Sequence, residues 1–252
     1  MENVHATLNK VFGLLGRNIS YSFSKGYFTQ KFKDLSLDDH FYRNFDIQSI
    51  DELEGVFKRF PELMGMNVTI PYKQEVMAHL DELSPLAEAI GAVNTIQFTS
   101  EGKRIGHNTD FYGFRDSLRP LLRPIHQKAL ILGTGGASKA VAHVFTKEGI
   151  PFTFVSRSKK EGQLTYEELN EAIVTSHKVI VNCTPLGTYP NVEDSPAIPY
   201  QFLTADHLLY DLTYNPTKTT FLKKGKEKGA TIINGYRMLE LQAEKSWEIW
   251  NS

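Results

Sequence analysis

The 252-residue sequence contains a single cysteine, Cys183, and no long apolar run. One cysteine excludes an internal disulfide and suits a reducing compartment, so we expect the protein in the cytoplasm. The first ten residues lack the apolar core of a secretory signal. No stretch approaches the length that a membrane-spanning helix needs, so we expect no membrane association.

The sequence also lacks an excess of either charge. It has 28 Lys and Arg against 29 Asp and Glu, a formal net charge of −1. Proteins that bind nucleic acid or anionic membranes usually carry a basic surface, so this balance argues against both. The eight histidines are far apart in sequence. We therefore expect no metal centre, although a site assembled from distant histidines stays open.

Residues 128–148 follow the order strand, glycine turn, helix. An apolar run at 129–132 suits a buried parallel strand, and three glycines follow directly within 133–136. Gly149 then ends the expected helix. Such glycines let the backbone approach a pyrophosphate, which lies at the helix N-terminus. Ser138 stands where the full glycine fingerprint has its third glycine, so a strand–turn–helix without ligand is the alternative.

Strands and helices alternate through both halves of the chain, which predicts an α/β fold with parallel sheets and two lobes separated by a cleft. The expected domains are an N-terminal α/β substrate domain of residues 1–110 plus 235–252 and a Rossmann-type doubly wound nucleotide domain of residues 111–234. We expect strands at 11–15, 41–47, 65–70, 129–132, 152–155, 179–182, 208–212 and 231–233, and a hairpin over 92–105. We expect helices at 25–35, 50–60, 71–80, 110–118, 136–148, 166–174, 219–228 and 238–250.

The loop after the second strand of the nucleotide domain indicates which nucleotide binds. A cofactor without a 2′-phosphate usually meets an acid about 20 residues beyond the glycines. Here the segment reads Val-Ser-Arg-Ser-Lys, without an acid. The guanidinium of Arg157 suits a phosphate, which favours NADP, and a solvated basic loop is the alternative.

Candidates for chemistry gather in the first domain. Lys73 would lie in the first turn of a helix, where the dipole favours its neutral form, and Asp110 lies at a helix start. Asn94 is polar within an apolar strand, and Ser22 and Ser24 face the same way in an extended segment. The alternatives are a solvated lysine, a plain N-cap carboxylate and loop or cap serines.

Together these segments resemble the shikimate dehydrogenase family over nearly the whole chain. The family's Asn-Val-Thr-x-Pro-x-Lys is similar to residues 67–73, its Gly-Ala-Val-Asn-Thr to 91–95, its Asn-Thr-Asp to 108–110 and its Gly-x-Gly-Gly-Ala to 133–137. Residues 182–187, 211–216 and 235–242 resemble later family segments. In the first loop, Asn18, Tyr21 and Lys25 stand where the family usually has Pro, His and Pro. His107 stands where relatives often have an acid, and its charge would change the field at Lys73.

The resemblance implies reversible NADPH-dependent reduction of 3-dehydroshikimate to shikimate, in the chorismate route to aromatic amino acids. The catalytic pair would be Lys73 and Asp110, exchanging a proton with the carbonyl oxygen. The resemblance implies as substrate-binding residues Ser22, Ser24, Thr69, Asn94, Tyr214 and Gln242. It implies as NADP-binding residues Gly133, Gly135, Gly136, Ala137, Ser156, Arg157, Ser158, Thr184, Leu212 and Gly235.

Other functions stay open from the sequence. A quinate dehydrogenase of the same wider family, or a methylene-folate dehydrogenase, would share the two-lobe plan. A non-catalytic nucleotide-dependent sensor would keep the fold without turnover. A short-chain dehydrogenase would use Tyr-x-x-x-Lys. That spacing occurs at 21/25, 27/31 and 214/218, but the first two precede the nucleotide domain and Pro216 interrupts the third. The partner is a small-molecule substrate, and the chain is expected to be a monomer or homodimer.

Overall fold

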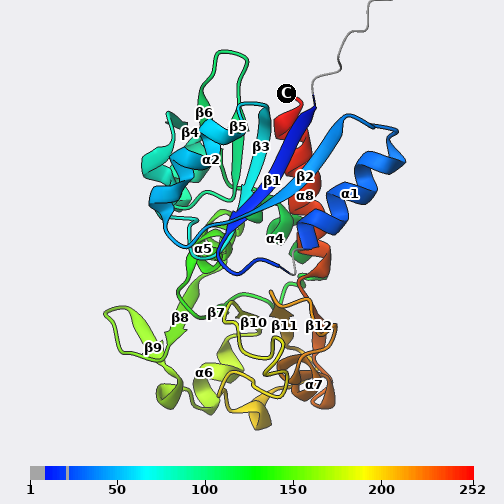
Figure 1. The fold of residues 1–252 in the computed structure, drawn as a ribbon. Coiled ribbons are helices and arrows are strands. Elements are labelled where there is room, and N and C mark those ends of the chain that lie inside the picture. The colour runs from blue at the N-terminus through cyan, green and yellow to red at the C-terminus, as the bar shows by residue number, and fades with distance from the viewer. Residues whose placement is uncertain (1–8, 21–22) are drawn as a thin grey trace, which may run out of the picture. The chain divides into compact units, whose positions relative to one another are not determined.

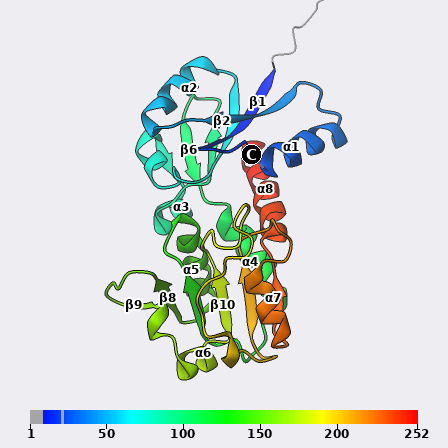
Figure 2. The same ribbon diagram turned by 60° about the horizontal axis from the view of Figure 1, so that its bottom comes forward.

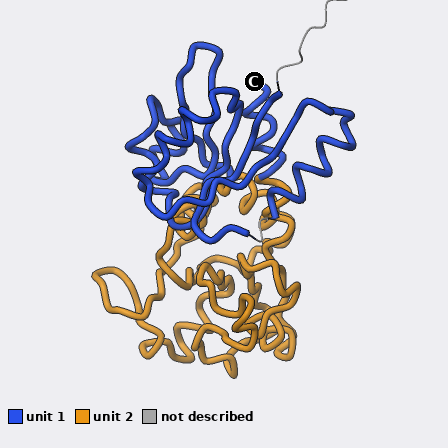
Figure 3. Tube along the Cα trace, viewed as in Figure 1, with its two compact units in different colours: residues 1–109, 243–252 blue, residues 110–242 orange. Residues whose placement is uncertain are grey.

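The computed structural model describes residues 9–20 and 23–252. Two compact units divide the chain, one of residues 1–109 and 243–252 and the other of residues 110–242 (Figure 3). The sequence placed the divisions after residues 110 and 234. In the structure, residues 235–242 therefore group with the second unit.

The first unit holds a six-stranded sheet in the order β2-β1-β3-β5-β6-β4 (Figure 1). Its strands are β1 (Lys10–Gly16), β2 (His40–Asp46), β3 (Leu63–Val68), β4 (Glu82–Leu83), β5 (Thr95–Phe98) and β6 (Arg104–His107). Its helices are α1 (Phe23–Asp34), α2 (Leu53–Arg59), α3 (Pro85–Ile90) and the 3-10 helices η1 (Ile50–Glu52) and η2 (Glu75–His79). β1 pairs in parallel with β2 and β3, but β5 is antiparallel to β3 and β6. The hairpin expected over 92–105 is confirmed in β5 and β6, so this sheet is mixed: parallel at β2, β1 and β3 and antiparallel at β5.

Side chains of β1 alternate between two cores, as the pleat of a strand requires. Phe12 and Leu14 belong to a cluster with Phe28 and Phe32 of α1 and with Trp250 near the C-terminus. Val11 and Leu15 of β1 belong to the cluster that includes Leu53 of α2. The first sheet is therefore covered on both faces by helices.

The second unit holds six parallel strands in the order β12-β11-β10-β7-β8-β9. These are β7 (Ala129–Leu132), β8 (Phe152–Ser156), β9 (Gln163–Thr165), β10 (Val179–Asn182), β11 (Leu208–Asp211) and β12 (Thr231–Ile233). Numbered from β7, the order is 3-2-1-4-5-6, which is that of a dinucleotide-binding Rossmann sheet. The predicted doubly wound fold is confirmed. The strand order reverses between β7 and β10.

Helices cover both faces of this sheet. They are α4 (Asp110–Leu118), α5 (Gly136–Glu148), α6 (Glu171–Ser176), α7 (Thr220–Glu227) and the 3-10 helices η3 (Arg119–Leu121), η4 (Tyr166–Glu168) and η5 (Tyr200–Phe202). The last helix, α8 (Tyr236–Trp250), begins in this unit, and its residues from Ala243 onward belong to the first unit. On one face, Leu130 and Ile180 share a cluster with Phe221 of α7. On the other, Phe114 of α4 contacts the rings of Phe145 of α5 and Tyr210 of β11. α5 and α7 thus pack on opposite faces (Figure 2).

The helix expected over 71–80 is wrong. Residues 71–74 form a turn, and only the 3-10 helix η2 follows. The backbone carbonyl of Lys73, which would bond four residues ahead in an α-helix, instead accepts from the N–H of Val93 at 2.7 Å. This long-range hydrogen bond occupies a carbonyl oxygen that an α-helix over these residues would need as an acceptor. The helices expected at 50–60 and 166–174 each begin as a 3-10 helix.

Candidate functional site

The switch point between β7 and β10 is the place where Rossmann sheets bind dinucleotides. Gly133 follows β7 with a φ of +98°, a left-handed conformation that favours glycine. A Cβ on Gly133 would lie 3.0 Å from Cγ2 of Thr184, just beyond β10. The two predicted cofactor residues are therefore in close contact at this point. Only glycine permits that approach in this conformation.

The turn into α5 leaves room for a ligand. Gly135 is the N-cap of this 13-residue helix, and a Cβ there would meet nothing within 4 Å. Ser138, at the place of the missing third glycine, is fully buried, and its hydroxyl donates to the carbonyl oxygen of Gly135 at 2.7 Å. The Ser138 hydroxyl bonds the turn on its buried side, and the space beside Gly135 stays open. A pyrophosphate at a helix N-terminus fits this arrangement.

The end of β8 keeps the features expected for a 2′-phosphate. Arg157 is exposed, and residues 156–160 contain no acid. The hydroxyl of Ser156 donates to the carbonyl oxygen of Ser158, which folds this loop on itself. Glu168, an acid of η4, pairs with Lys159 at 2.5 Å. The loop can therefore offer a guanidinium to an anion.

A buried carboxylate that the sequence analysis did not single out organises the same edge of the sheet. Asp211, at the end of β11, accepts from Nδ2 of Asn182 at 3.0 Å and from Oγ1 of Thr219 at 2.5 Å. Oδ1 of Asn182 in turn accepts from the N–H of Thr184 at 3.0 Å and from its hydroxyl at 2.6 Å. Burial raises the pKa of Asp211 to about 6. The sequence signal for this site was a polar residue at the end of each of two apolar strands, Asn182 and Asp211.

Two further predicted cofactor residues meet next to β11. A Cβ on Gly235 would lie 2.1 Å from the carbonyl oxygen of Leu212, so these two backbones are in direct contact. Tyr214 is half-buried nearby in sequence, and burial raises the pKa of its phenol. Gln242 lies on α8, whose backbone packs closely against Gly113 of α4. Ala137 and Gly136 occupy the first turn of α5.

In the first unit, the predicted substrate residue Asn94 belongs to a buried polar cluster. Asn94 is 2% exposed, and its Oδ1 accepts from the backbone N–H of Thr109 at 2.6 Å. Asn67, at the end of β3, is linked through its amide to Thr95 at 3.2 Å. Thr69 lies just beyond β3 and is half-buried, with its N–H donating to the carbonyl oxygen of Leu15 at 2.9 Å. These groups can hold hydroxyls and a carboxylate.

The two proposed catalytic residues belong to different units of the chain. Lys73 is half-buried in the turn before η2, so the helix-dipole argument for its neutral form does not hold. Asp110 begins α4, as predicted, and is 3% exposed. It is the first residue of the second unit. Burial lowers the pKa of His107 below its usual 6.5, so this side chain is neutral at neutral pH.

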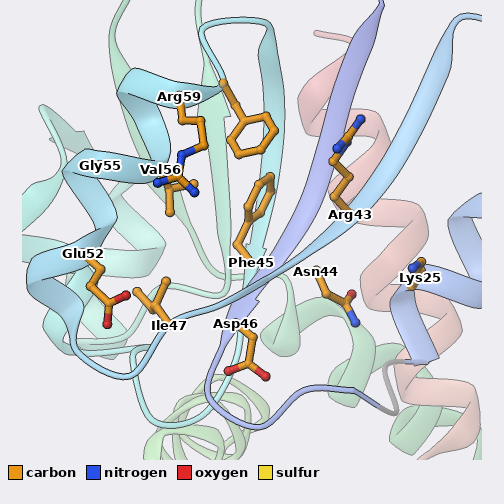
Figure 4. Close-up of a pocket in the computed structure, with 11 residues that line it drawn as sticks. Lys25, Arg43, Asn44, Phe45, Asp46, Ile47, Glu52, Gly55, Val56 and Arg59 are labelled. Atoms are coloured by element: carbon orange, nitrogen blue, oxygen red, sulfur yellow. The ribbon is translucent and has the colours of Figure 1, made fainter.

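The predicted serine pair is only partly described. Ser22 lies outside the described residues, whereas Ser24 is half-buried in the first turn of α1. A cavity of about 650 Å³ lies along β2 and α2. It is lined by Arg43, Asp46 and Arg59 among others, and by none of the described predicted site residues (Figure 4).

Neither a metal-binding cluster nor a membrane-spanning helix is found in the described part of the chain. Residues 9–20 and 23–252 contain no group of three or more His, Cys, Asp or Glu side chains that would hold a metal ion. Among the same residues, no helix combines the length and apolar character that crossing a membrane requires.

Comparison with known proteins identifies the family. The family model for the shikimate dehydrogenase substrate binding domain matches residues 14–96. A shikimate dehydrogenase (NADP(+)) from Methanococcus maripaludis is 37% identical, over 96% of this chain and 91% of that protein. The chain belongs to the shikimate dehydrogenase family. The predicted resemblance is confirmed.

Solved structures of this family share the whole fold. Shikimate dehydrogenase from Thermus thermophilus, crystallised with NADP(H) and shikimate, is 30% identical with a TM-score of 0.84, covering 96% of this chain and 93% of that one. A quinate dehydrogenase from Corynebacterium glutamicum, solved with NAD, is 25% identical with a TM-score of 0.84 over 96% and 93%. The fold therefore does not by itself separate shikimate from quinate dehydrogenases.

One departure from the usual shikimate dehydrogenase pattern has a structural account. Asn18, where the family usually has proline, adopts a φ of +56°, which proline cannot reach. Its backbone N–H donates to Oδ1 of Asp46 at 2.9 Å, and that of Ile19 donates to Oδ2 at 3.2 Å. Figure 4 shows the Asp46 carboxylate directed at this loop. The first loop is therefore held in a shape that a proline at position 18 would forbid.

Proposed function

We propose that the protein is an NADP-dependent shikimate dehydrogenase that catalyses the reversible reduction of 3-dehydroshikimate to shikimate. The observation that carries this proposal is the 37% identity with a shikimate dehydrogenase (NADP(+)) across 96% of the chain. The reaction belongs to the chorismate route to aromatic amino acids.

The second unit fits the nucleotide. The open space in front of Gly135 and the close contact of Gly133 with Thr184 suit a pyrophosphate at the start of α5. Arg157 would hold the 2′-phosphate, flanked by Ser156 and Ser158. The other holding residues would be Gly136, Ala137, Thr184, Leu212 and Gly235. The nicotinamide supplies the hydride chemistry when it is bound.

The chain's own residues supply the proton. Reduction of a ketone places a hydride on carbon and requires a proton on oxygen. We assign that proton to Nζ of Lys73, which takes it back during oxidation. Asp110 is assigned as the second catalytic residue, acting with Lys73 in this proton exchange. The substrate's carboxylate and hydroxyls would be bound by Ser22, Ser24, Thr69, Asn94, Tyr214 and Gln242.

Initial-rate measurements on the purified protein test this function. We expect NADP⁺ reduction with shikimate, and a lower efficiency with quinate, whose additional ring hydroxyl needs a further partner. Absence of turnover with shikimate, with binding of NADP⁺ retained, would favour the sensor function. Equal efficiency with quinate would favour the broader quinate/shikimate activity. The cytoplasmic location and the monomeric or dimeric state remain predictions.

A further inference from the structure

Ser246 is a fully buried serine on α8 that the proposed chemistry does not use. Its Oγ lies 2.9 Å from Nδ2 of Asn67, 2.8 Å from Oγ1 of Thr95 and 3.2 Å from Oγ1 of Thr109. One hydroxyl therefore joins three segments of the first unit that are far apart in sequence. All four residues belong to that unit.

Each partner of Ser246 adjoins a residue assigned to the substrate or to catalysis. Asn67 precedes Thr69 by two positions, Thr95 follows Asn94, and Thr109 precedes Asp110. Ser246 itself lies one helical turn after Gln242 on α8. The serine thus contacts three residues that each lie within two positions of an assigned residue, without being assigned itself.

The hydrogen bonds from Tyr42 through Asn67 to Ser246 run in one direction. Tyr42 is buried, and burial raises the pKa of its phenol, so the hydroxyl stays protonated and donates to Oδ1 of Asn67 at 2.8 Å. The amide nitrogen of Asn67 must then face Ser246, which accepts from it. Between Ser246 and the hydroxyls of Thr95 and Thr109, either oxygen can be the donor.

Asn94 completes the cluster. Its Oδ1 accepts from the backbone N–H of Thr109 at 2.6 Å, and its Nδ2 donates to the Thr109 hydroxyl at 3.0 Å. These contacts fix which end of the Asn94 amide is the acceptor within the cluster. In a buried cluster, a lost hydroxyl leaves its partners unsatisfied, and they reorient.

We propose that Ser246 is a positioning residue for substrate binding, which holds Asn67, Thr95 and Thr109 so that the Asn94 amide keeps its orientation. This inference rests on the proposed function, because Asn94 is assigned there to the substrate. It adds a residue of the C-terminal helix to the determinants of shikimate affinity.

Steady-state kinetics of Ser246→Ala tests the inference. We expect the KM for shikimate to rise about tenfold, the size expected when a buried hydrogen bond is removed, with the KM for NADP unchanged. We expect kcat to fall much less than the KM rises, since Ser246 is not in contact with the reacting atoms. Ser246→Cys keeps the volume but hydrogen-bonds weakly, so its KM for shikimate should rise as well.

Ser117→Ala is the matched control. Ser117 is a buried serine of α4 whose hydroxyl donates to backbone carbonyls and bonds Tyr210 at 2.7 Å. Its loss should lower the melting temperature without changing the KM for shikimate. If Ser246→Ala and Ser246→Cys lower only the melting temperature, as Ser117→Ala does, Ser246 is merely structural and the inference is wrong. A parent protein without shikimate turnover would instead overturn the proposed function, and this inference with it.

Discussion

The Asp211 carboxylate and the Asn182 amide are joined by a hydrogen bond of 3.0 Å across the carboxyl ends of β10 and β11. The carboxylate is fully buried, and it holds Asn182, which in turn holds Thr184 next to Gly133. A buried charge beside a proposed cofactor loop has consequences for both stability and binding.

Asp211 should make stability depend on pH in a defined window. Its pKa is raised from 3.8 to about 6 in the folded protein, so the folded state holds this proton more tightly than the unfolded state. Its contribution to the free energy of unfolding is therefore largest at low pH and falls as the pH rises from about 4 to about 6. The fall amounts to at most about 3 kcal/mol, at 1.36 kcal/mol per pKa unit.

Asp211→Asn should remove this contribution, because the amide does not titrate. Urea unfolding of parent and variant at several pH values measures it. As the pH rises from about 4 to about 6, the unfolding free energy of the parent should fall relative to that of the variant. Parallel curves would refute the prediction. The exposed Asp38→Asn serves as the control.

The first loop should reject the residue that the family usually has at position 18. Asn18→Pro removes the N–H that donates to Asp46 and requires a φ near −65° in place of +56°. We expect a loss of at least about 1 kcal/mol in unfolding free energy, since the native conformation is incompatible with proline. Because the loop leads to the proposed serine pair, the KM for shikimate should also rise.

Asn18→Gly is the matched control for the loop. Glycine keeps the backbone N–H and adopts a positive φ freely, so stability and KM should stay near those of the parent. A proline variant as stable and active as the parent would show that the loop tolerates both shapes.

Lys73 should govern turnover. Lys73→Ala is expected to lower kcat by roughly 10²–10⁴-fold, the usual range for general acid–base catalysis, with NADP affinity nearly normal. Asp110→Asn should also be severe, and the double variant should lose much less than the product of the two losses, because the residues act as a unit. Kinetics at saturating shikimate and NADP measure these effects, with the exposed Lys58→Ala as control. If only the KM for shikimate changes, Lys73 binds substrate and does not transfer the proton.

Arg157 should set the preference for NADP over NAD. Arg157→Ala is expected to raise the KM for NADP and to leave that for NAD nearly unchanged, because only NADP carries the 2′-phosphate. Arg119→Ala, which removes another exposed arginine of the second unit, should change neither. A parent enzyme that uses NAD as efficiently as NADP would contradict this prediction.

The sequence by itself determined the elements whose signal is local. The apolar run at 129–132, its glycines and the helix closed by Gly149 were predictable because strand and helix periods and turn chemistry are properties of neighbouring residues. The family was predictable because its motifs are also contiguous segments. The position of Asp110 at a helix start follows for the same reason.

Only the tertiary structure decided which polar groups, distant in sequence, form hydrogen bonds with one another. The turn at Lys73 exists because its carbonyl bonds Val93. The contacts of Ser246 and the bond between Asn182 and Asp211 join segments that no periodicity relates. Each is a hydrogen bond made in a buried place, where a group left unpaired costs free energy, so burial selects the partner. Local sequence pattern encodes which residues are buried, but it does not encode which buried polar groups will meet.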